Sequence, residues 1–77
     1  MTNIEKFTES YTKFYDSYYE YMEEMFKEED GHIELEKEDS MWVVEKLKDD
    51  PYRDVLFQCM NDIVVEIVTN LESKYSN

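Results

Sequence analysis

The chain has 77 residues, a net charge of −12 at pH 7, 42% hydrophobic residues and 16% aromatic residues. This length allows one small domain, and the single cysteine, Cys59, excludes an intramolecular disulfide. The aromatic content argues against a disordered acidic tail, and the negative charge disfavours direct binding to nucleic acid or to anionic lipid.

The first predicted element is a long helix over residues 3–29. Steps of three and four residues place one set of apolar side chains on a single helical face, namely Ile4, Phe7, Tyr11, Phe14, Tyr18, Tyr21 and Met25. A second stripe lies beside this face and contains Tyr15, Tyr19, Met22 and Phe26. Thr2 and Glu5 match a capping box, and Gly31 marks the C-terminal stop.

An acidic connector follows over residues 30–39, in which Ile33 and Leu35 alternate with polar residues and leave a short strand open. We expect a short helix over 40–49, with Asp39 or Ser40 as its cap. Asp50 and Pro51 then form a restart signal for a third helix over 51–75.

The third helix is apolar nearly all round, so its own chain or a second copy must cover it. Only one glycine and one proline interrupt the chain, which favours helices over a loop-rich or all-β fold. The sequence therefore predicts an all-α fold in a single domain over 1–77, ordered as long helix, acidic connector, short helix and long helix. We expect dimerisation to complete this small bundle as a homodimer.

Acidic residues are concentrated between Glu20 and Asp39, where ten of them stand against two lysines, a net charge of −8. On the first helix, Glu9, Asp16, Glu23 and Asp30 recur every seven residues, a row expected opposite the aromatic face. The alternative interpretation is an ordinary solvated helix face, but such a face usually pairs Glu with Lys, and this window has ten acids against two lysines. We expect the following carboxylates to contact a basic protein partner: Glu20, Glu23, Glu24, Glu28, Glu29, Asp30, Glu34, Glu36, Glu38 and Asp39.

The tyrosines of the first helix provide a second candidate surface. Core packing is the simpler use of these side chains, but Tyr15 or Tyr19 could anchor a protein partner. A small adaptor or regulatory subunit that binds through this tyrosine-rich face is therefore the main alternative function.

A metal-dependent enzyme is the third alternative. Glu20, Glu23, Glu36 and Asp39 formally resemble the E-x-x-E … E-x-x-D pattern of the MazG-like nucleotide pyrophosphohydrolases, which would imply magnesium. Asp54–Gln58 resembles the helix that carries that family's second pair, but Pro51 stands where the family has a glutamate. His32 and Cys59 have no partners for catalysis nearby in sequence, so we expect no enzyme activity, no metal and no cofactor.

A very small, acidic, aromatic-rich and all-α chain resembles the DNA-mimic inhibitors of phages and mobile elements, which include anti-restriction proteins, anti-CRISPR proteins and inhibitors of HU nucleoid proteins. This resemblance concerns the physical profile of the whole chain, not a motif. It implies an inhibitor that occupies the basic DNA-binding groove of a host protein. Residues 1–5 lack the features of a signal peptide, so we expect a cytoplasmic protein, in the bacterial host if a phage encodes it.

Overall fold

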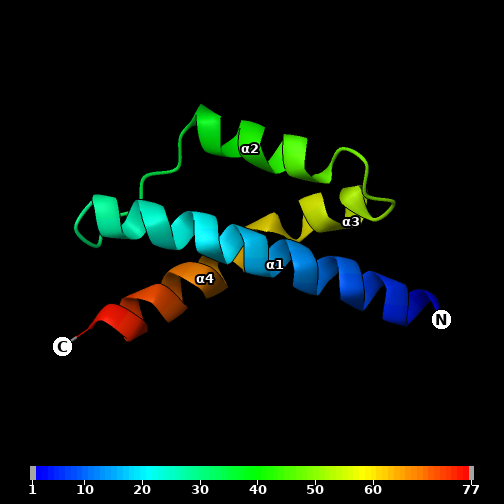
Figure 1. The fold of residues 1–77 in the computed structure, drawn as a ribbon, viewed down its shortest axis with the longest axis horizontal. Coiled ribbons are helices and arrows are strands. Elements are labelled where there is room, and N and C mark those ends of the chain that lie inside the picture. Colours follow the sequence, from blue (N-terminus) through cyan, green and yellow to red (C-terminus); the bar gives the residue numbers. More distant parts are fainter. Residues whose placement is uncertain (1, 77) are drawn as a thin grey trace.

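The computed structural model describes residues 2–76, and this part of the chain forms four helices: α1 (Asn3–Glu28), α2 (Lys37–Leu47), α3 (Arg53–Gln58) and α4 (Met60–Tyr75). The long helix α1 contacts both α2 and α4, and it crosses α4 in the view of Figure 1. Residues 2–76 contain no strand, and 32–36 form no regular secondary structure, so the predicted all-α class is confirmed. Residues 1 and 77 of the predicted domain lie outside the described part.

Helix α1 begins and ends within one residue of the prediction because its end signals are local. The Glu5 backbone N–H donates to Thr2 Oγ1 at 3.1 Å, which caps the N-terminus. At the other end, Gly31 N–H donates to the Phe26 carbonyl at 2.8 Å and Asp30 N–H donates to the Lys27 carbonyl at 3.4 Å. This pair of bonds is a Schellman motif, with Asp30 (φ 54°) and Gly31 (φ 88°) in the left-handed region.

Helix α2 begins at Lys37, three residues before the predicted start, and ends at Leu47 rather than 49. The predicted cap, Asp39 or Ser40, is wrong. Glu36 occupies the cap position, and Asp39 lies one turn inside the helix, where its Oδ2 accepts from the Glu36 backbone N–H at 2.7 Å. The helix therefore starts earlier because Asp39 binds back to the residue that precedes the first turn.

The predicted single helix over 51–75 is also wrong, because the chain forms two helices that meet at Cys59. Asp50 Oδ1 accepts from the Tyr52 N–H at 2.8 Å in a turn, so α3 starts only at Arg53. The Cys59 N–H then donates to both the Val55 and Leu56 carbonyls at 3.1 Å, which tightens the last turn of α3. No glycine or proline marks this break, so local sequence signals could not reveal it.

The hydrophobic core runs along the inner side of α1. On α1 the core residues are spaced four apart and come from both predicted stripes: Phe14 and Tyr18 from the first, Met22 and Phe26 from the second. Ile4, also predicted in the first stripe, is 79% exposed in the first turn. All four helices contribute to the core: Phe14, Tyr18, Met22, Phe26, Val43, Leu47, Leu56, Ile63, Ile67 and Leu71. The molecule measures 42 × 26 × 16 Å, so many side chains remain near its surface.

Candidate functional site

Most of the acidic window lines one depression, here called the acidic groove, where the end of α1 meets the connector and the start of α2. It has a volume of about 420 Å³, and Tyr21, Met25 and Asp39 lie among its lining residues. Six exposed carboxylates complete the lining: Glu24, Glu28, Glu29, Glu34, Glu36 and Glu38. Seven of the ten acidic residues of the window therefore line one concave surface that three segments assemble.

Local structure explains why these carboxylates converge. Glu24 and Glu28 are four residues apart on α1 and so share one helical face. The Schellman motif then reverses the chain at Asp30 and Gly31. In the connector that follows, Glu34 and Glu36 both line the acidic groove, whereas the intervening Leu35 lines a different depression.

Asp39 links the groove to α1. It is 7% exposed, and its Oδ1 accepts from the Tyr21 hydroxyl at 2.6 Å, while Oδ2 accepts from the Glu36 N–H. The Tyr21 ring stacks on Trp42 of α2, with 4.6 Å between the ring centroids. The hydrogen bond to Asp39, followed by desolvation and the negative charge of Asp39, raises the pKa of Tyr21 to about 12. These contacts fix the start of α2 against α1.

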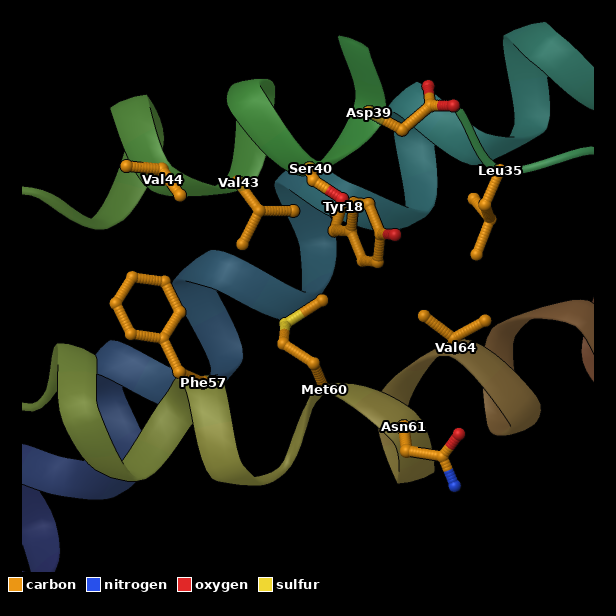
Figure 2. Close-up of a pocket in the computed structure, with 10 residues that line it drawn as sticks. All are labelled: Tyr18, Leu35, Asp39, Ser40, Val43, Val44, Phe57, Met60, Asn61 and Val64. Carbon is orange, nitrogen blue, oxygen red and sulfur yellow. The ribbon is translucent and has the colours of Figure 1, made fainter. Parts of the chain in front are cut away.

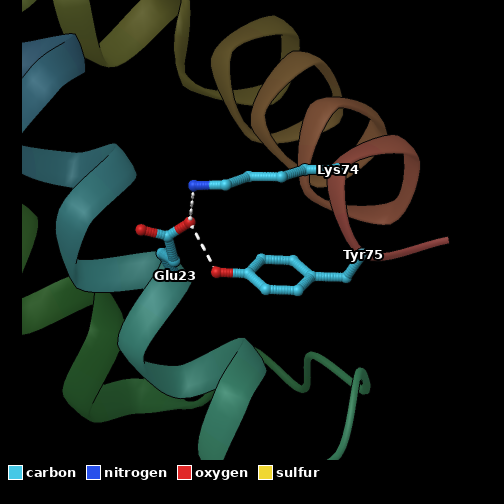
Figure 3. Close-up of polar contacts among 3 residues, drawn as sticks. All are labelled: Glu23, Lys74 and Tyr75. Atoms are coloured by element: carbon cyan, nitrogen blue, oxygen red, sulfur yellow. Dashed lines mark hydrogen bonds and ion pairs between the residues drawn. The ribbon is translucent and has the colours of Figure 1, made fainter.

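Glu23 was expected on the outer face of α1, but the structure places it against α4 (Figure 3). Its Oε2 accepts from Lys74 Nζ at 2.7 Å and from the Tyr75 hydroxyl at 3.0 Å, and its side chain is only 16% exposed. These hydrogen bonds lower the pKa of Glu23, and the bond to Glu23 raises the pKa of Lys74. Glu23 thus joins the C-terminal ends of two helices.

The ten predicted contact residues therefore fall into three groups. Six line the acidic groove as exposed side chains, and Asp39 lines it as a buried one. Glu20 and Asp30 are exposed outside the groove, and Glu23 is engaged by Lys74 and Tyr75.

The groove carboxylates have little internal compensation. His32 Nε2 lies 3.4 Å from Glu34 Oε1, and both side chains are largely exposed. Within residues 2–76, the remaining five exposed groove carboxylates make no ion pair. The groove therefore concentrates negative charge, which a cationic partner would neutralise.

The tyrosine-rich face is used mainly for internal packing. Tyr18 and Tyr21 stack with Trp42, and Tyr11, Tyr15 and Tyr19 form a ladder of stacked rings along α1. The Tyr15 hydroxyl accepts from Asn70 of α4 at 3.2 Å. Of the seven tyrosines, only Tyr75 is exposed.

A second depression, here called the apolar groove, was not anticipated from the sequence. It lies between α2 and the α3–α4 pair and has a volume of about 410 Å³ (Figure 2). Buried Tyr18 and Val43, with half-buried Met60, form its floor, and exposed Leu35, Val44 and Phe57 form its rim. The one feature of the sequence that could have indicated this groove is the surplus of apolar residues on the third predicted helix.

The residues that resemble a metal-binding pattern do not come together as a metal site. Across residues 2–76, no three His, Cys, Asp or Glu side chains are grouped so that they could hold a metal ion. Two members of the pattern, Glu23 and Asp39, already have internal hydrogen-bond partners. Cys59 is a half-buried free thiol, and His32 is exposed on the connector.

The fold and the surface define a small all-α protein in which an acidic groove and an apolar groove adjoin each other. Comparison of the chain with protein-family models, curated proteins and solved structures found no significant match. Within residues 2–76, no helix combines the length and apolar character needed to cross a membrane.

Proposed function

We propose that the protein is a DNA-mimic inhibitor that presents the acidic groove to the basic DNA-binding surface of another protein and so competes with DNA. One observation carries this proposal: six exposed carboxylates from three segments line one depression, and five of them make no ion pair within residues 2–76. Such an array attracts the Lys and Arg side chains that normally hold phosphates.

The spacing and rigidity of the array support this role. Glu24 and Glu28 of the groove are four residues apart on α1, which is about 6 Å along the helix axis. Hydrogen bonds at Asp39 and Glu23 hold the surrounding helices in place. A preordered array loses less conformational entropy on binding than a flexible acidic tail would.

Competition with DNA can be measured on a defined target. The assay follows displacement of a fluorescent duplex from a purified basic DNA-binding protein, such as a histone-like HU protein or a restriction, CRISPR or repair enzyme. We expect displacement that weakens steeply as salt concentration rises, because both interactions are electrostatic.

A matched pair of triple variants tests the groove. The groove triple, Glu24→Gln with Glu28→Gln and Glu34→Gln, should weaken displacement by about tenfold or more. The control triple, Glu9→Gln with Asp16→Asn and Glu72→Gln, removes the same charge from exposed positions outside the groove and should have a much smaller effect. Equal losses in both triples, or a target that holds duplex and inhibitor together, would contradict the proposal.

The homodimer stays a prediction, but fewer exposed apolar side chains now support it. Ile63, Ile67 and Leu71 of α4 are completely covered within one chain, whereas Val55 and Val65 remain exposed. Sedimentation equilibrium over a range of concentrations measures whether a second copy covers these side chains. The cytoplasm is the compartment in which such an inhibitor would meet its target.

A further inference from the structure

The apolar groove adjoins the acidic groove, and a single stretch of chain separates them. Asp39 lines both depressions, while Leu35 and Ser40 line only the apolar one and Glu36 and Glu38 line only the acidic one. Segment 34–40, here called the ridge, therefore lies between the two depressions, and its four carboxylates outnumber its one cation, Lys37. A ligand that lies across this ridge meets both chemistries within a few residues.

The apolar groove is open and nearly uncharged. Among residues 2–76, Asp39 is the only charged residue that lines it, and both carboxylate oxygens of Asp39 already accept hydrogen bonds. Its volume of about 410 Å³ is within the range of about 300–1,000 Å³ that is usual for ligand sites. Figure 2 shows the Val43, Phe57 and Met60 side chains pointing into the space between the helices. The groove therefore offers an apolar surface to side chains from outside.

Charge decides which occupant fits. A second copy would bring another net charge of −12, with its own acidic groove, close to this ridge. Repulsion between the two copies would oppose that contact, as it would oppose contact with nucleic acid or an anionic membrane. A segment with cationic side chains is attracted by the same field.

We propose that the two grooves together bind a basic amphipathic segment of the partner protein, with its bulky apolar side chains in the apolar groove and its Lys or Arg side chains in the acidic groove. This inference rests on the proposed function and adds the recognition chemistry of the partner. Helix-in-groove binding supplies the general mode, in which apolar anchors set the affinity and flanking charges set orientation and speed of association.

The two contributions differ in their response to salt. Attraction between exposed charges is screened over about 8 Å at physiological ionic strength, whereas apolar burial is not screened. Binding of an amphipathic basic segment should therefore keep part of its affinity at high salt. Binding of a basic segment without apolar anchors should lose nearly all of it.

Three synthetic helical peptides of equal length provide the probes. The first carries Leu on one face and Lys on the other, the second replaces Leu with Gln, and the third replaces Lys with Gln. Fluorescence anisotropy at low and high salt measures their affinities. We expect the first peptide to bind at least about tenfold tighter than the second, and this ratio to persist at high salt.

Val44 and Val65 provide a matched pair of variants, because each is 57% exposed but only Val44 lines the groove. Val44→Asn should weaken binding of the Leu–Lys peptide by about fivefold, and Val65→Asn should change it by less than about twofold. Circular dichroism and Trp42 fluorescence check that both variants fold.

Three outcomes would overturn the inference: equal binding of the first two peptides, equal effects of the two valine variants, or a dimer of the wild type that Val44→Asn abolishes. If the first two peptides bind equally while duplex displacement persists, the apolar groove has no role but the proposed function stands. If no basic peptide binds and no duplex is displaced, the proposed function itself fails.

Discussion

Substitution of Tyr21 tests whether the link between α1 and α2 holds the acidic groove in shape. Tyr21→Phe removes the hydroxyl that donates to Asp39 Oδ1 at 2.6 Å and leaves the ring on Trp42 in place. Asp39 is 7% exposed, so water replaces the lost donor poorly. A hydrogen bond to a charged group contributes about 1.5–3 kcal/mol, and we expect the free energy of unfolding to fall by about 2 kcal/mol.

Urea denaturation at pH 7, followed by the fluorescence of the single tryptophan, measures this loss. For a domain of this size, about 2 kcal/mol corresponds to a fall of roughly 8–16 °C in Tm. Tyr15→Phe is the matched control, because its hydroxyl has an exposed, uncharged partner, Asn70, at 3.2 Å. The control should lose about 0.5 kcal/mol or less.

The pH dependence gives a second measure of the same bond. The pKa of Tyr21 rises from 10.0 to about 12 in the folded protein, so folding favours the protonated phenol. Its contribution is fully present below about pH 10 and is lost as pH rises from about 10 to 12. The stability difference between the wild type and Tyr21→Phe should shrink over that window. A difference at pH 7 below about 0.5 kcal/mol, or one that stays constant up to pH 12, would refute this account of the link.

Two further substitutions test the packing of α4. Glu23 has a lowered pKa, so its contacts with Lys74 and Tyr75 stabilise the fold above pH 4.5 and lose this effect as pH falls through the lowered pKa. The difference in unfolding free energy between the wild type and Glu23→Gln, measured by urea denaturation, should therefore shrink at acid pH. A difference that stays constant with pH would contradict the ion pair between Glu23 and Lys74. Ile67 is completely buried and Val65 is 57% exposed. In the same assay, Ile67→Ala should lower the free energy of unfolding by about 2–5 kcal/mol and Val65→Ala by less than about 0.5 kcal/mol. Equal losses would show that α4 packs through a different face.

Much of the helical architecture follows from local signals in the sequence. The spacing of aromatic residues, the Thr2–Glu5 cap and the stop near Gly31 predict α1 to within one residue, because each depends on groups no more than five positions apart. The same signals gave only the approximate place of α2. Asp39 could serve as a cap or lie one turn further in, and the hydrogen bond from Tyr21, 18 residues away, belongs to the second arrangement.

The tertiary structure alone decided the fate of individual carboxylates and the shape of the candidate site. Sequence spacing placed Glu23 on the outer face of α1, but contact with Lys74, 51 residues away, holds it against α4. Nothing local marks the break at Cys59. Composition and charge pattern by themselves determined an acidic, all-α chain, because periodicity and capping act within a few residues. Packing of the four helices decided that this charge lines one groove and that an apolar groove lies next to it. The sequence could not decide this, because a groove depends on how distant segments meet.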